Sequence, residues 1–262
     1  MSKEKSVAVT RRGAVMEICL SRPQVRNALD ADCLQALLGA FTEAANDQSV
    51  RTVMLTGEGP VFCAGGDLKS IFTSHAPQAI QRFLDLQIRP LIRAMINLDK
   101  PILAVLNGPA AGAGISLTMA SDLVVAAEEA SFVTAFGKIG VMPDSGALYF
   151  LAHRLGMNRA KELVFLNQTL TAKEAKEIGL YNWVVPSKDL MVEGRKIADQ
   201  LASGPTVAHG LAKKALRDAL RSTFDAFMDN EALSMALLIS TEDQTEGLAA
   251  FAEKRNPQFV GR

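Results

Sequence analysis

The sequence predicts an α/β fold followed by a helical C-terminal region. Three observations support this prediction. Strand-length apolar runs alternate with amphipathic helical patterns over the first two-thirds, two glycine-rich segments each follow a strand, and the last third is helical throughout. Alternation of this kind is typical of parallel strands joined by helical crossovers. We therefore expect an α/β core over residues 1–203 and a helical region over residues 204–262.

The expected elements can be placed in chain order. Strands are predicted at residues 7–10, 14–20, 52–56, 102–106, 122–126 and 182–185. Asp30 is a good N-cap for a helix with an apolar stripe, and a second helix is predicted over residues 77–96. Thr171 and Glu174 form a capping box that opens a short helix. The C-terminal helices are expected at residues 190–202, 205–220, 224–240 and 242–254.

Composition excludes several classes of protein. The 262 residues carry 28 Lys and Arg against 28 Asp and Glu, and 48% are hydrophobic. So apolar a chain is not disordered, and its balanced charge argues against a nucleic-acid partner. Three cysteines at no metal-ligand spacing indicate free thiols in a reducing compartment. With neither a signal peptide nor a membrane span in the sequence, we expect a cytoplasmic protein.

The two glycine-rich segments are the first candidates for chemistry. They cover residues 57–68 and residues 107–114, and the second runs into a helix. A glycine-rich turn after a strand is commonly only a turn. Two such loops, however, can each direct one backbone N–H at a single developing oxyanion. No metal or redox cofactor is expected.

Several segments carry a resemblance to a known family. Ser21-Arg22-Pro23 with Asn27-Ala28-Leu29, residues 62–68 and residues 107–119 resemble three successive signatures of the crotonase (enoyl-CoA hydratase/isomerase) superfamily. Residues 171–185 and 251–255 are similar to the same family. The resemblance implies a crotonase-like spiral of β-β-α units, a C-terminal helical trimerisation region and an acyl-CoA thioester substrate. It also implies self-association as a trimer or a dimer of trimers.

Matching positions imply individual roles. The backbone N–H groups of Ala64 and Ala113 would form the oxyanion hole for the thioester oxygen. The resemblance also implies that Lys254 reaches the CoA phosphates from another subunit, although it is equally well a solvated charge in a helical tail. Further CoA contacts are implied for Gln24, Val25, Arg26, Ala64, Gly65, Gly66, Asp67 and Leu68.

The catalytic carboxylates of the family's hydratases are absent. Their two positions hold Ser116 and Phe136, which cannot act as acid or base near neutral pH. Asp144, in Gly140-Val141-Met142-Pro143-Asp144, instead resembles the carboxylate of the family's isomerases, including the epoxyphenylacetyl-CoA isomerase type. An isomerase needs one base, which removes a proton and returns it to another carbon. The alternative role of Asp144 is to cap a helix at residues 145–155, and the two roles are compatible.

We expect apolar residues to surround Asp144 and to raise its pKa by desolvation. The helix at residues 77–96 and five nearby side chains are the candidates for this acyl pocket: Phe136, Ile139, Val141, Met142 and Tyr149. The leading hypothesis is therefore an acyl-CoA isomerase. Three alternatives stay open: a hydratase with non-standard acid and base residues, a hydrolase or dehalogenase with Asp144 as nucleophile, and a catalytically silent acyl-CoA-binding protein.

Overall fold

The computed structural model describes residues 5–71 and 76–262. Its main element is a six-stranded sheet with the order β1-β2-β3-β4-β6-β9. β1 and β2 form an antiparallel pair, and every later neighbour is parallel. All six predicted strands are present with small shifts at their ends: β1 (Val7–Arg12), β2 (Val15–Leu20), β3 (Thr52–Gly57), β4 (Ile102–Leu106), β6 (Leu123–Ala127) and β9 (Trp183–Val185).

A second, three-stranded sheet was not predicted. It consists of β5 (Ala110–Ala111), β7 (Ser131–Val133) and β8 (Thr169–Thr171). These strands have two or three residues each, which is too short for an alternating pattern to be recognised in the sequence. β5 nevertheless belongs to the second glycine-rich loop, which is one of the two candidates for chemistry in the sequence.

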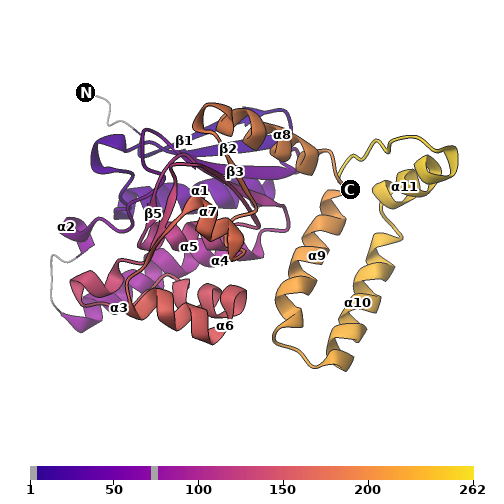
Figure 1. Cartoon of the computed structure of the whole chain (residues 1–262). Helices are drawn as coiled ribbons and strands as arrows, with labels where there is room; N and C mark the ends of the chain where they lie inside the picture. The colour runs from indigo at the N-terminus through magenta and orange to yellow at the C-terminus, as the bar shows by residue number, and fades with distance from the viewer. Residues whose placement is uncertain (1–4, 72–75) are drawn as a thin grey trace.

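Alternate residues of the central strands face two hydrophobic cores. Met16, Ile18 and Val53 pack into the larger core with the helices on one face of the sheet. Strand residues that point to the opposite face of the sheet, such as Met54 and Val105, form the second core with α8 (Figure 1). Helices of the first two-thirds are α1 (Ala31–Asn46), α2 (Leu68–Ile71), α3 (Pro77–Phe83), α4 (Arg89–Asn97), α5 (Ala113–Ala120), α6 (Ala147–Phe165) and α7 (Ala172–Glu177). The central strands are therefore covered on both faces, as parallel sheets usually are.

The predicted helix at residues 77–96 is interrupted. α3 is followed by a π-helical turn at Leu84–Ile88, and α4 begins at Arg89. Pro90 lies in the first turn of α4 and has no N–H to donate to the preceding turn, which explains why regular α-helical bonding does not pass through this point. π-helical turns are frequent at functional sites, and this one borders the candidate pocket.

The C-terminal helices follow the predicted pattern closely. They are α8 (Leu190–Ala202), α9 (Thr206–Ala219), α10 (Phe224–Leu238) and α11 (Glu242–Glu253). Figure 1 shows α9, α10 and α11 on one side of the α/β core, with α9 and α10 lying side by side. α10 has no buried residue, so its apolar side chains do not belong to an internal core. The division at residue 203 falls between α8 and α9. In the described chain no helix is long and apolar enough to cross a membrane.

Candidate active site

The first glycine-rich loop follows β3 and runs beside the segment that precedes α1. The Leu29 N–H donates to the Gly65 carbonyl at 2.8 Å, and the Asp67 N–H donates to the Leu29 carbonyl at 2.9 Å. The Ala64 N–H donates to the carbonyl of Arg26 at 3.0 Å. The prediction that the Ala64 N–H serves as an oxyanion donor is therefore wrong, because that donor is already bonded within the fold.

The N–H of Gly66, two residues after Ala64, points away from the segment that contains Arg26 and Leu29. Gly66 pairs with Leu29 as a parallel bridge through the N–H and carbonyl groups of its neighbours. Successive amides of an extended segment point to opposite sides, so the Gly66 N–H points away from Leu29. Gly66 lines the candidate pocket, and within the described residues its N–H has no hydrogen-bond partner. The first loop therefore offers the N–H of Gly66.

The second glycine-rich loop supplies the predicted donor at Ala113. Ala113 is the first residue of α5, so its N–H has no partner within the helix. Ala111 ties this loop to the first, since its N–H donates to the Cys63 carbonyl at 2.9 Å. The two loops touch closely: a Cβ atom built on Gly65 would lie 3.2 Å from the Ala113 nitrogen. Both Gly65 (φ +97°) and Gly112 (φ +52°) adopt backbone conformations that favour glycine.

A pocket of about 360 Å³ opens between these loops and the π-helical turn. Of the predicted pocket residues, Phe136, Ile139 and Val141 line it, together with residues of the segment predicted as one helix. Met142 is 71% exposed, and Tyr149 lies elsewhere, where its hydroxyl accepts from Arg221. The prediction is wrong for these two. Among the described residues, the apolar side chains that line the pocket are Leu68 at the end of the first glycine-rich loop, and Ile71, Ile80, Phe83, Leu84, Ile88, Ala135, Phe136, Ile139 and Val141 beyond the two loops.

Asp144 contributes the carboxyl group of this pocket. It lies in the loop before α6, and its Oδ1 accepts from the Ser145 hydroxyl at 2.8 Å. Burial raises the pKa of Asp144 above its ordinary value, and the Ser145 hydrogen bond opposes that change. Asp144 does not cap the following helix, because α6 begins at Ala147 with Gly146 as its N-cap and no side-chain cap. The carboxylate is therefore available to the pocket.

The two positions that lack the hydratase carboxylates both lie around Asp144. Ser116 is fully buried in α5, and its hydroxyl donates to the Asp144 carbonyl at 3.3 Å. Phe136 lines the pocket with an exposed fraction of 8%. One position thus supports the backbone of Asp144 and the other makes its surroundings apolar. Within the described residues, no other side chain that lines this pocket is ionisable.

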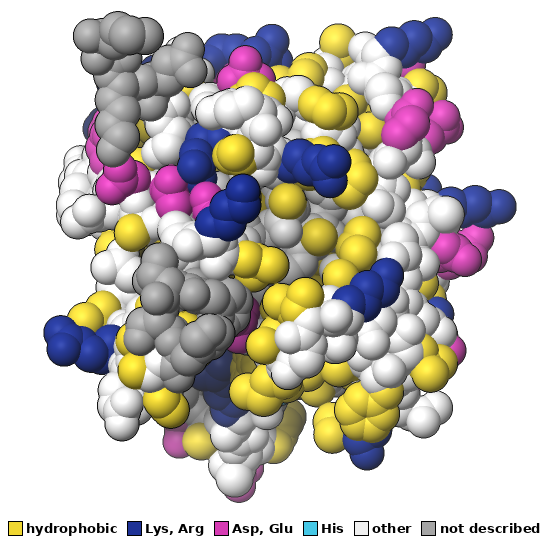
Figure 2. Space-filling view, turned by 90° about the vertical axis from the view of Figure 1, so that its left-hand side faces the viewer, with side chains coloured by type: hydrophobic (Ala, Val, Ile, Leu, Met, Phe, Trp, Pro, Cys, Tyr) yellow, Lys and Arg dark blue, Asp and Glu magenta, His cyan; other side chains and the backbone are white. Residues whose placement is uncertain are grey.

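The residues implied for CoA binding fall into two groups. Ala64, Gly66 and Leu68 line the pocket, and Gln24, Val25 and Arg26 are joined to the first loop through the Ala64–Arg26 hydrogen bond. Figure 2 views this side of the molecule, where hydrophobic side chains lie beside Lys and Arg side chains. Lys254 is the C-cap residue of α11, and Figure 1 shows α11 on the opposite side of the chain from α2. A single chain therefore does not bring Lys254 to this pocket.

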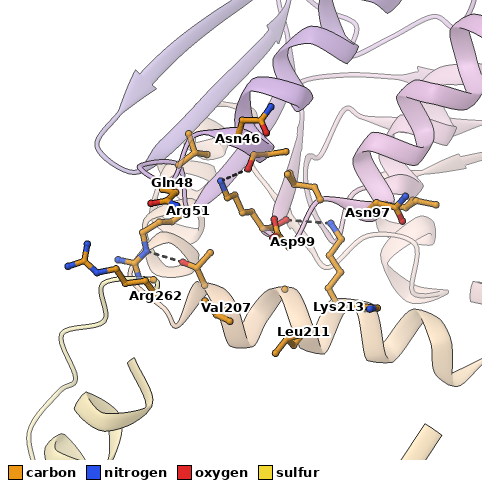
Figure 3. Close-up of a pocket in the computed structure, with 18 of the residues that line it drawn as sticks. Asn46, Gln48, Arg51, Asn97, Asp99, Val207, Leu211, Lys213 and Arg262 are labelled. Carbon is orange, nitrogen blue, oxygen red and sulfur yellow. Dashed lines mark hydrogen bonds between the residues drawn. The ribbon is translucent and has the colours of Figure 1, made fainter. Parts of the chain in front are cut away.

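A larger cavity of about 840 Å³ lies between α9, the core and the C-terminal residues. Figure 3 shows Lys213 pointing from α9 toward the core and Arg51 reaching from the core toward α9. Lys213 pairs with Asp122 at 2.8 Å, while Arg51 donates to the Thr206 hydroxyl at 3.0 Å and to the Phe259 carbonyl at 2.8 Å. These cations hold the C-terminal region against the core, so we do not assign this cavity to catalysis. The described residues include no group of three or more His, Cys, Asp or Glu that could hold a metal ion.

Comparison with known proteins identifies the family. Residues 10–262 match the enoyl-CoA hydratase/isomerase family, and the chain belongs to this family within the crotonase superfamily of enzymes. It is 36% identical to the 1,2-epoxyphenylacetyl-CoA isomerase of Escherichia coli K12 over 95% of both chains. It is 38% identical to a probable enoyl-CoA hydratase of Rhodobacter capsulatus over 94% of both chains. The crystal structure of an enoyl-CoA hydratase subunit from Geobacillus kaustophilus superposes with a TM-score of 0.91, 35% identity and 98% coverage of both chains. The crotonase-like fold predicted from the sequence is confirmed.

Proposed function

We propose that this protein is an acyl-CoA thioester isomerase that uses Asp144 as its one base and the N–H groups of Gly66 and Ala113 as its oxyanion hole. The observation that carries the proposal is that, among the described residues, one apolar pocket combines a single carboxyl group with two backbone N–H donors that have no hydrogen-bond partner. The similarity to an isomerase and to a probable hydratase of the same family supports a CoA thioester as substrate.

The proposed reaction moves one proton. Asp144 removes a proton from a carbon next to the thioester, and the carbonyl oxygen becomes an enolate oxygen. The two N–H groups stabilise that charge, and the loss of one such donor typically raises a barrier by about 2.7–4 kcal/mol. Asp144 then returns the proton to another carbon, which completes a double-bond shift or follows the opening of a ring. A hydratase would need a second acid or base, and the hydratase positions hold Ser116 and Phe136.

The substrate test separates isomerase from hydratase. We expect 3-enoyl-CoA and 2-enoyl-CoA thioesters, incubated separately with the protein, to interconvert, because one base suffices for that reaction. 1,2-epoxyphenylacetyl-CoA is the third substrate, and an isomer of equal mass is the expected product. Liquid chromatography with mass spectrometry distinguishes the outcomes. Accumulation of the 3-hydroxyacyl-CoA would contradict the proposal in favour of a hydratase. A covalent adduct on Asp144 would indicate a nucleophilic mechanism. Tight binding of acyl-CoA without turnover would indicate a catalytically silent acyl-CoA-binding protein.

We also propose that the chain self-associates through its C-terminal helices, as a trimer or a dimer of trimers. On α10, Phe224, Met228 and Met235 follow one another at helical spacing and are exposed by 76%, 43% and 54%. Exposed apolar stripes of this kind mark contact surfaces. Assembly would also offer Lys254 of one copy to the pocket of another.

Light scattering coupled to size-exclusion chromatography tests this assembly. We expect a trimeric or hexameric mass for the parent and a shift toward monomer for Met235→Asp, because a carboxylate at an apolar contact must be desolvated. Asn230→Asp, which adds the same charge at a polar position of α10, is the matched control and should keep the parent mass. A monomeric parent would contradict the proposal.

A further inference from the structure

The turn that presents Asp144 has an unusual backbone. Two consecutive residues after Asp144 adopt positive φ, with +53° at Ser145 and +82° at Gly146. Glycine tolerates this region freely, but a serine in it bears a conformational cost. A non-glycine residue persists in the left-handed region when the surrounding structure supplies a compensating interaction. Ser145 has one, because its hydroxyl donates to Oδ1 of Asp144 at 2.8 Å.

The main chain of Asp144 is fixed independently of its carboxylate. Its carbonyl oxygen accepts the Ala147 N–H at 2.8 Å and the hydroxyl of the fully buried Ser116 at 3.3 Å. These two contacts hold the backbone, and neither involves a carboxylate oxygen. The carboxylate itself accepts from the Asp144 backbone N–H and, among the described side chains, from the hydroxyl of Ser145, which also lines the pocket.

We propose that Ser145 is a positioning residue, whose hydroxyl binds Oδ1 of Asp144 and so leaves Oδ2 as the oxygen that takes up and returns the proton. The inference rests on the proposed function, because it assigns the base of that reaction to one oxygen. A hydroxyl that donates to Oδ1 favours the ionised carboxylate and restricts its rotation. The positive φ values of this turn place the Ser145 hydroxyl beside the Asp144 carboxylate, which a regular helix start would not do.

No competing charge faces this carboxylate within the described residues. The pocket elements packed around it contribute apolar side chains: Leu68 and Ile71 of α2, Ile80 and Phe83 of α3, Leu84 and Ile88 of the π-helical turn, and Phe136 and Ile139 before the loop. Desolvation by these neighbours raises the pKa of Asp144, and no charged neighbour contributes to that shift. The hydroxyl of Ser145 is therefore the side-chain donor that opposes the desolvation.

Two substitutions separate the hydroxyl from the backbone. Ser145→Ala removes the donor and keeps a Cβ at positive φ, whereas Ser145→Gly removes the donor and relieves the backbone cost. We expect both to lower kcat for 3-enoyl-CoA isomerisation by about tenfold, with KM nearly unchanged, since a hydrogen bond to a charged group contributes that much. We also expect both to move the acid limb of the pH–rate profile to higher pH. Ser145→Gly should unfold at a higher temperature than Ser145→Ala. Ser203→Ala, which removes an exposed hydroxyl bonded to Gln200 in α8, is the control and should match the parent.

The outcomes distinguish this inference from the proposed function. In an Asp144→Asn background, Ser145→Ala should have no further effect on residual turnover, because Ser145 acts only through Asp144. If Asp144→Asn abolishes turnover while Ser145→Ala and Ser145→Gly keep the parent pH profile, the inference is overturned and the proposed function stands. If Asp144→Asn leaves turnover unchanged, the proposed function itself fails. Titration of the ¹³C-labelled Asp144 carboxyl by NMR decides the inference without turnover: an upward shift in both variants supports it, and an unmoved titration overturns it.

Discussion

Replacing Asp144 with Asn is expected to lower kcat by roughly 10²–10⁴-fold, the usual contribution of a general acid or base. Asn keeps the size of the side chain and removes the proton acceptor. In the described part of the pocket lining no other ionisable side chain can replace it. KM should change much less than kcat, because in the proposed mechanism the carboxylate takes part in proton transfer rather than in holding CoA. Steady-state kinetics with 3-enoyl-CoA measures both parameters.

The same substitution has a predicted effect on stability. Burial raises the pKa of Asp144 in the folded state above its ordinary value, so the folded protein holds the proton more tightly than the unfolded chain. Stability attributable to this group is therefore present at low pH and is lost as the pH rises through the folded-state pKa. We expect Asp144→Asn to raise the melting temperature at neutral pH and to lose that advantage in acid.

Parent-like turnover in a folded Asp144→Asn variant would remove Asp144 from the mechanism.

Much of the architecture was predictable because it depends on long, local patterns. The buried central strands and the helix that begins after Asp30 have strong apolar periodicity, and Asp30 does cap α1 by accepting from the Cys33 N–H. The capping box of Thr171 and Glu174 is also present. Missed features are those that depend on short segments or on remote partners. The strands of the small sheet are too short to show a period, and the π-helical turn interrupts a pattern that otherwise continues.

The candidate site shows the same limit at the level of single atoms. Residue type and spacing indicated the two loops and Asp144, but not which amide of the first loop is free. That depends on pairing with Leu29 and Arg26, which are distant in sequence from Gly66 and Ala64. Ser145 was missed for a related reason, because the direction of its hydroxyl depends on a positive φ that the residue type does not reveal. The two positive φ values explain why the turn directs a hydroxyl at Asp144 instead of capping α6 with it.

Gly65→Ala is expected to disturb the contact between the two glycine-rich loops and to lower turnover. A Cβ at this position would lie 3.0 Å from the Ala111 carbonyl oxygen, 3.1 Å from the Gly112 Cα and 3.2 Å from the Ala113 nitrogen. All three are backbone atoms, so the second loop must move, and the Ala113 N–H moves with it. We expect kcat to fall by about 10²-fold, near the effect of losing one oxyanion donor. Because alanine at position 65 would have to adopt this positive φ, the substitution should also reduce the free energy of unfolding by about 1–3 kcal/mol.

Gly179→Ala separates these two effects. Gly179 follows α7 with φ +81°, and a Cβ there would meet no atom within 4 Å. The variant therefore carries the backbone cost without crowding the loops. Urea unfolding should show both variants destabilised, whereas kinetics should show lost turnover for Gly65→Ala only. Equal turnover in the two variants would mean that the spacing of the loops does not control the chemistry, and the oxyanion hole would then have to lie away from Ala113.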